Sequence, residues 1–105
     1  MKILVCCAEG NVRSVATRFI INSLGNFDVL ACGASRNNPE TLKILSDWAD
    51  MILLAEKPMI DMLPEENRNK VNKEFELGPD IWGNPFNPDL HTKIKEELRK
   101  INFPL

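Results

Sequence analysis

The sequence predicts an α/β fold, a single three-layer domain in which a four-stranded parallel sheet carries helices on both faces. Continuous apolar runs, typical of strands buried on both faces, alternate with amphipathic segments along residues 1–105. Alternation of this kind predicts strand–helix–strand units and hence parallel strands. A chain of 105 residues fits one domain and leaves little room for a second.

The first half of the chain is predicted to hold two strands and two helices. Residues 3–6 are apolar throughout and form the first predicted strand. Residues 14–24 have apolar side chains at helical spacing, and residues 27–32 form the second strand. Asn38 and Pro39 supply an N-cap and a first-turn proline for the second helix.

The middle of the chain is predicted to complete the sheet. Residues 51–55 are apolar and form the third strand, followed by a short helix over residues 58–63. The charged residues 65–70 are expected to form a surface loop. Residues 71–77 alternate between apolar and polar side chains, which predicts a half-exposed fourth strand.

The end of the chain is predicted to be an irregular segment and then a helix. Residues 78–88 are rich in glycine and proline, so we expect no regular structure there. Asn87 and Pro88 then begin a last helix. Its apolar residues form one stripe: Leu90, Ile94, Leu98 and Ile101.

Composition excludes several classes of protein. The formal net charge of −2 argues against a dedicated nucleic-acid-binding protein. The three cysteines include an adjacent pair, which is a poor disulfide framework. With one histidine, His91, and no CxxC pair, we expect no zinc site. No apolar run is long enough for a signal peptide or a membrane span, so we expect a cytoplasmic protein without membrane contacts.

The strongest functional signal is the loop between the first strand and the first helix, where Cys7, five residues later Arg13, and Ser14 follow one another. A loop entering a helix N-terminus directs backbone N–H groups at one point, which attracts an anion and stabilises a thiolate. An arginine can bind two phosphate oxygens at once. We therefore predict that Cys7 attacks a bound phosphate, held by Arg13, by Ser14 and by the intervening residues Ala8, Glu9, Gly10, Asn11 and Val12.

A phosphate ester also needs a proton for its leaving oxygen. Asp80 follows the predicted fourth strand, where a loop can fold over the Cys7 pocket, and we predict it to be the general acid. A turn-forming aspartate beside proline and glycine is the alternative. Trp82 is predicted to wall the pocket and to stack on an aryl substrate, with simple core packing as its alternative. Cys6 points away from Cys7 and is expected in the core, with a redox role as the alternative.

Taken in order, these motifs resemble the low-molecular-weight protein tyrosine phosphatases, particularly their short members. The resemblance rests on the start Lys2-Ile3-Leu4-Val5-Cys6-Cys7 with Arg13-Ser14, and on four weaker matches: Ala31-Cys32-Gly33-Ala34-Ser35, Asp47-Trp48-Ala49-Asp50-Met51-Ile52, Asp80-Ile81-Trp82-Gly83 and Asn87-Pro88-Asp89-Leu90. It covers nearly the whole chain.

The resemblance implies a mechanism without metal or organic cofactor. Cys7 would form a phosphocysteine while Arg13 and the loop amides hold the equatorial oxygens. Asp80 would protonate the leaving group and then activate water, and Ser14 would hydrogen-bond the thiolate. The implied partner is a phosphotyrosine protein or a small phosphate ester, and free phosphate or sulfate is expected to occupy the same loop.

The sequence departs from the family at three positions. Gly10 stands where the family usually has an asparagine in a left-handed conformation; glycine keeps that geometry but loses the side-chain brace. Glu9 places a carboxylate in a phosphate loop, where it repels substrate unless it points outward or pairs with a cation. Ile81 replaces the proline that follows the acid.

Other functions remain open on this pattern. A module that reads phosphate without hydrolysing it is compatible with Glu9 and Gly10. A phosphocysteine carrier of the enzyme IIB type shares the strand, cysteine and loop, but does not use Arg13 or Asp80. An arsenate reductase on this fold needs later cysteines, and none follows Cys32. Phosphoserine hydrolysis depends on pocket depth, which the sequence does not define.

Overall fold

The computed structural model describes residues 1–105 and contains a three-stranded parallel sheet with the strand order β2-β1-β3. The strands are β1 (Lys2–Cys7), β2 (Asp28–Gly33) and β3 (Met51–Leu54), as the apolar runs predicted to within about one residue at most ends. Because β1 is central, the chain passes to one side of it for β2 and to the other for β3. The carboxyl end of β1 is therefore a topological switch point, where ligands bind in open α/β sheets.

Three α-helices match the predicted ones: α1 (Arg13–Asn22), α2 (Pro39–Trp48) and α3 (Pro88–Lys100). Asn38 caps α2 by accepting a hydrogen bond from the Thr41 N–H, and Asn87 caps α3 in the same way from Asp89 and Leu90. Two 3-10 helices, η1 (Lys57–Met62) and η2 (Glu65–Lys70), follow β3. The second of these replaces the surface loop expected at 65–70.

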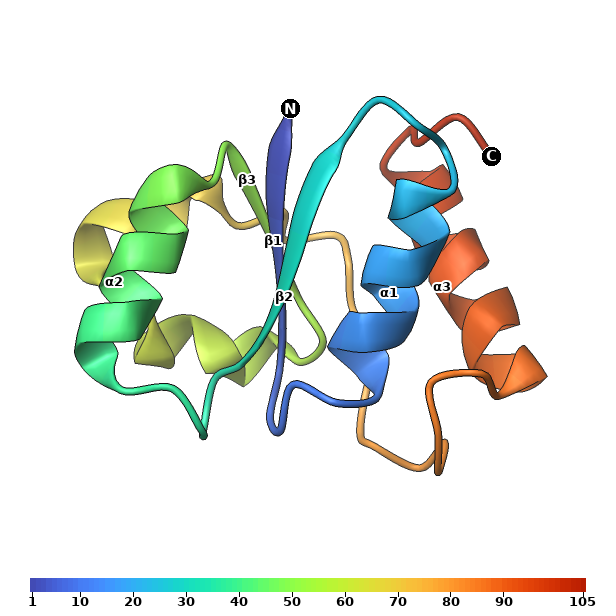
Figure 1. Ribbon diagram of the computed structural model, residues 1–105, viewed down its shortest axis with the longest axis horizontal. Coiled ribbons are helices and arrows are strands. Elements are labelled where there is room, and N and C mark those ends of the chain that lie inside the picture. The colour runs from blue at the N-terminus through green and yellow to red at the C-terminus, as the bar shows by residue number, and fades with distance from the viewer.

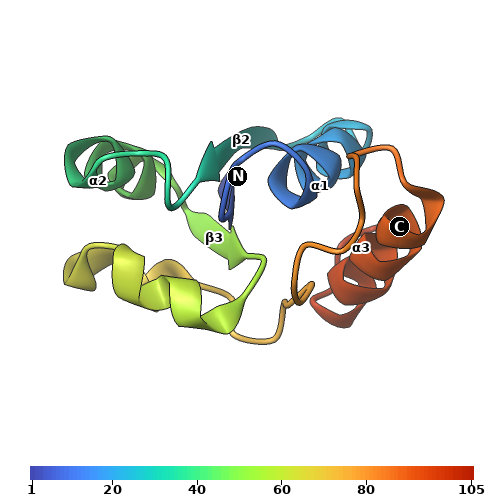
Figure 2. The ribbon, with the colours of Figure 1, turned by 90° about the horizontal axis from the view of Figure 1, so that it is seen from below.

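The sheet separates two apolar cores. Figure 1 shows α1 and α3 on one face, and α2 with η1 and η2 on the other; Figure 2 shows the same layers from below. Alternate residues of β1 enter opposite cores, so Ile3, Val5 and Cys7 join the α1–α3 side. Leu4 and Cys6 join the α2 side, with Cys32 of β2. The adjacent cysteines Cys6 and Cys7 thus belong to different cores.

The predicted fourth strand at residues 71–77 is wrong. Only Val71 forms a bridge, to Ile52, and the Asn72 N–H donates to the Ile52 carbonyl. The Asn72 side chain then accepts from the Glu74 N–H, forming a turn that leads the chain away from β3. The segment returns only at Leu77, whose N–H donates to the Ala55 carbonyl. Alternating side chains fit this half-buried segment as well as they fit a strand, and the turn at Asn72 decides against the strand.

No helix of this structure is both long enough and apolar enough to cross a membrane.

Candidate active site

Cys7 is the last residue of β1 and lies at the carboxyl end of the central strand, only 2% exposed. The chain then turns through residues 8–12 into α1, which begins at Arg13. In Figure 1 this turn, the end of β2 and the segment before α3 all lie at the lower edge of the molecule. The strand–loop–helix order read from the sequence is confirmed.

The Cys7 sulfur lies between two hydrogen-bonding groups of its own loop. The Gly10 N–H donates to Sγ over 3.2 Å. The Ser14 hydroxyl lies 3.1 Å from Sγ and accepts from the thiol; towards a thiolate the hydroxyl is the donor.

Gly10 is the residue that closes the loop. Its φ of +76° is in the left-handed region, and a Cβ added there would lie 2.5 Å from the Gly33 nitrogen. A Cβ on Gly33 would in turn lie 2.6 Å from the Glu9 carbonyl carbon and oxygen. Two backbones approach each other here without side chains between them, so an asparagine at position 10 would not fit. The Asn37 side chain supplies a brace at this contact by accepting from the Gly33 N–H over 3.1 Å.

The end of β2 holds the start of the loop. The Ala34 N–H donates to the Cys7 carbonyl over 2.7 Å, and the Ser35 N–H donates to the Ala8 carbonyl over 3.0 Å. The Ser35 hydroxyl donates to the same Ala8 carbonyl. These bonds hold the first residues of the loop against the end of β2, and the Gly10 N–H further along the loop is directed at the Cys7 sulfur.

Arg13 is buried, with 2% exposure, although it carries a full charge. Its Nη1 donates to Glu56 Oε1 and to the Gly78 carbonyl, each over 2.6 Å. Its Nε has no hydrogen-bond partner. Glu56 follows β3, so this ion pair spans the switch point between β1 and β3. The Nη1 side of the guanidinium is therefore held by the protein, while the buried Nε of the same group has no acceptor.

Glu9 pairs with a cation, one of the conditions under which its carboxylate fits a phosphate loop. The carboxylate forms an ion pair with Arg36, and both side chains are exposed. Of the remaining predicted loop residues, Asn11 is exposed, and Ala8 and Val12 are half-buried. None of these three side chains forms a hydrogen bond within the protein.

Asp80 lies in the segment 78–87, which we call the acid loop. It is exposed, and its carboxylate forms no hydrogen bond or ion pair with Cys7 or Arg13. The Gly78 carbonyl, two residues earlier, accepts from Arg13, which puts the start of the acid loop at the site. Trp82 packs against the core that contains Cys7, and its buried indole N–H has no partner. The acid loop thus lies on the Cys7 side of the sheet.

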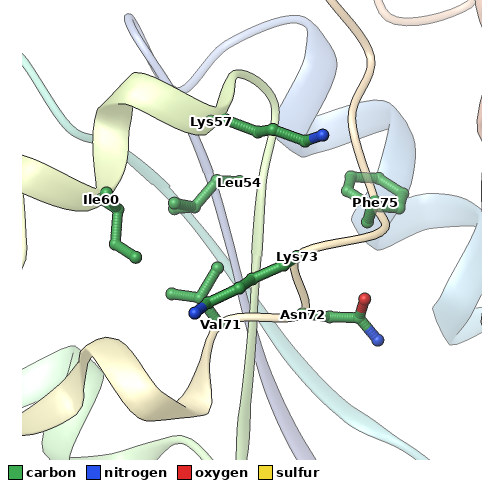
Figure 3. A pocket seen from close by; sticks show the side chains of 7 residues that line it. All are labelled: Leu54, Lys57, Ile60, Val71, Asn72, Lys73 and Phe75. Carbon is green, nitrogen blue, oxygen red and sulfur yellow. The ribbon is translucent and has the colours of Figure 1, made fainter.

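A separate cavity of about 380 Å³ lies where the segment 71–75 leaves β3 (Figure 3). The apolar side chains of Leu54, Ile60 and Val71 converge there, between two lysine side chains. Its lining residues are Leu54, Lys57, Ile60, Val71, Asn72, Lys73 and Phe75. None of the predicted site residues contributes to it. No group of three or more His, Cys, Asp or Glu side chains is placed to hold a metal ion.

Sequence reasoning missed four residues that shape the site: Glu56, Gly33, Asn37 and the Gly78 carbonyl. Glu56 carried a usable signal, because a charged residue directly after a buried parallel strand lies at the edge where ligands bind. Gly33 and the Gly78 carbonyl act through contacts with residues far away in the sequence, and Asn37 acts through its bond to Gly33.

Among solved structures, the chain is similar to the arginine phosphatase YwlE from Geobacillus stearothermophilus. The two share 20% sequence identity, with a TM-score of 0.64, over 95% of this chain and 92% of the other. This likeness covers nearly the full length of both chains and shows a shared fold of the low-molecular-weight phosphatase type. No family model matches the chain, and no curated protein matches it either.

Proposed function

We propose that residues 1–105 form one phosphatase-like domain that hydrolyses phosphate monoesters through a phosphocysteine on Cys7. The observation that carries the proposal concerns buried side-chain polar atoms. Two of them lack a partner, Arg13 Nε and Trp82 Nε1, and both belong to the predicted site. A buried donor without an acceptor is rare and needs an explanation. A phosphate oxygen held by the loop would supply the acceptor that Arg13 Nε lacks.

The loop forms the anion-binding half of this site. Backbone N–H groups of a loop that enters a helix N-terminus would favour a dianion, and the second edge of Arg13 would bind equatorial oxygens. Glu56 and Gly78 hold the first edge of Arg13, so the guanidinium is oriented before substrate arrives. Ala8, Glu9, Gly10, Asn11 and Val12 would contribute backbone only.

The reaction has two displacement steps. In the first, the Cys7 thiolate attacks phosphorus, the bond to the leaving oxygen breaks, and Asp80 gives that oxygen a proton. In the second, Asp80 takes a proton from water, the water oxygen attacks phosphorus, and the sulfur–phosphorus bond breaks. Inorganic phosphate leaves, and Cys7 returns to its starting form.

The substrate is a phosphotyrosine protein or another phosphate monoester, with Trp82 beside the leaving group. The similar protein is by its name an arginine phosphatase, so a phosphoarginine protein is the second substrate to assay. A phosphate-reading module without turnover is the competing function. The observation in its favour is that the Asp80 carboxylate is exposed and contacts neither Cys7 nor Arg13.

The test is metal-free hydrolysis of an aryl phosphate by the reduced protein, with phosphotyrosine and phosphoarginine peptides assayed in parallel. Cys7→Ser should lower turnover by about 10³-fold or more, because a serine hydroxyl is a far weaker nucleophile than a cysteine thiolate. Cys32→Ser, which changes a buried cysteine in the other core, is the matched control and should retain turnover. Turnover that survives in Cys7→Ser would overturn the proposal. Phosphate binding without turnover would support the competing function, a module that binds phosphate groups and does not hydrolyse them.

A further inference from the structure

The other two cysteines form a close pair on the opposite face of the sheet. Cys6 of β1 and Cys32 of β2 are direct partners in the parallel register. Both are free thiols in the α2-side core, and their sulfurs lie 2.9 Å apart. The phosphatase mechanism uses neither of them.

The backbone already has the spacing that a disulfide needs. Neighbouring strands lie about 4.8 Å apart, within the range of about 4.4–6.8 Å between Cα atoms that disulfides span. A bond of about 2.05 Å therefore requires the two sulfurs to approach by side-chain rotation, without separation of the strands. Cys7 cannot compete for either sulfur, because its side chain lies in the other core.

The two thiols differ in reactivity. The hydrogen bond with Cys32 and burial raise the pKa of Cys6 well above its usual value. The same hydrogen bond lowers the pKa of Cys32, although burial opposes the shift. Cys32 is also the more accessible of the two, with 5% exposure against 0% for Cys6. The thiol that ionises more readily is therefore also the one on the less buried residue.

We propose that Cys6 and Cys32 form a redox site at which hydrogen peroxide converts the two thiols to a disulfide. The Cys32 thiolate attacks one peroxide oxygen, and the O–O bond breaks to give a sulfenic acid and hydroxide. The hydroxide takes up the proton that Cys32 released and becomes water. The Cys6 sulfur then attacks the sulfenic sulfur, and the departing oxygen leaves as a second water with the Cys6 proton. Two thiols are oxidised, and one peroxide is reduced to two waters.

The disulfide would lie directly beneath the phosphate loop. Cys6 precedes Cys7, and Cys32 precedes Gly33, whose backbone packs against Glu9 and Gly10. Oxidation would thus join the two strands that hold the loop while leaving the Cys7 thiol free. This inference stands apart from the proposed hydrolysis, since its readout is a covalent bond that forms whether or not the protein turns over phosphate.

The test treats the full-length reduced protein with stoichiometric hydrogen peroxide, alkylates the remaining thiols and maps the linked peptides by mass. We expect a loss of about 2 Da, the mass of two hydrogens, a Cys6–Cys32 link, an alkylated Cys7 and full reversal by dithiothreitol. Cys6→Ser and Cys32→Ser should each abolish the link. Cys7→Ser should form it at the wild-type rate.

Three outcomes would overturn the proposal. One is a link that involves Cys7. Another is oxidation of Cys32 to sulfinic acid without a link, which would mean that Cys6 does not reach it. The third is no change at Cys6 and Cys32 while Cys7 is oxidised. All three are read from wild-type protein, so a variant that failed to fold would not obscure the result.

Discussion

The two halves of the candidate site, the phosphate loop at residues 7–14 and the acid loop at residues 78–87, are built in opposite ways. The phosphate loop is held by backbone contacts with β2, among them the Ala34 N–H on the Cys7 carbonyl and the Gly10–Gly33 approach. Several hydrogen bonds of the acid loop stay within it, such as the Phe86 N–H to Asn84 and the Asn87 side chain to the Trp82 carbonyl. The proposed anion site is thus fixed by the backbone, whereas placement of the proposed acid depends on side-chain packing.

Gly10→Ala should have the largest effect, because the new Cβ meets the Gly33 nitrogen at 2.5 Å and φ is +76°. We expect loss of phosphate binding and a fall in unfolding free energy of about 1–3 kcal/mol. Gly83→Ala in the acid loop is the matched control. Its φ is similar, +85°, but no atom lies within 4 Å of the added Cβ. Thermal unfolding with and without phosphate measures both variants. Equal losses of phosphate binding and of unfolding free energy in the two variants would contradict the distinction between the two loops.

Arg13→Lys should come next. Lysine keeps the charge but cannot bind Glu56 and Gly78 with one edge and phosphate with the other. We expect kcat/KM and phosphate affinity to fall by about 10²-fold. Arg36→Lys, at the exposed ion pair with Glu9, is the control and should change either quantity less than about threefold. Calorimetric phosphate titration and steady-state kinetics measure both variants. Unchanged phosphate affinity in Arg13→Lys would contradict the assigned role.

Asp80→Asn tests the acid loop alone. Because an acid matters most for a poor leaving group, kcat/KM, which reports the first displacement step, should fall by about 10²-fold for an alkyl phosphate and much less for a nitrophenyl phosphate. Phosphate affinity should stay at the wild-type value, since Asp80 is outside the phosphate loop. Kinetics across a series of leaving groups gives the answer. A loss that is equal across the series would assign Asp80 a structural role.

The smallest expected effect concerns the anchor before the acid loop, where the buried Glu97 of α3 accepts from the Glu76 N–H over 3.1 Å. Burial raises the pKa of Glu97, but the hydrogen bonds from Lys100 and Glu76 and the charge of Lys93 outweigh it and lower the pKa overall. A lowered folded-state pKa adds stability above the unfolded value of about 4.3, and that stability is lost as pH falls through the folded value. Glu97→Gln should therefore cost about 1 kcal/mol at neutral pH and flatten the acid limb of a pH–stability curve. An unchanged acid limb would show that Glu97 does not anchor this segment.

The same contrast explains what could be predicted from the sequence. The strand–loop–helix around Cys7 is local, so apolar runs and spacing were sufficient to place it. The prediction of a fourth strand at residues 71–77 was wrong because the alternating pattern also fits a half-buried irregular segment. The turn at Asn72 decides between the strand and the irregular segment. The Gly10–Gly33 contact and the Arg13–Glu56 pair join residues far apart in the sequence, and no local pattern contains that information. The role of Asp80 stays a prediction, because its carboxylate contacts neither Cys7 nor Arg13.

The most direct test of the central claim is to trap the covalent intermediate. Asp80→Asn protein mixed with a nitrophenyl phosphate and quenched in acid should carry an adduct of about 80 Da, because the second step lacks its base. Peptide mapping should place the phosphoryl group on Cys7, and Cys7→Ser in the same background should carry none. A phosphoryl group on another residue, or burst release of nitrophenol by a protein that lacks Cys7, would contradict the account.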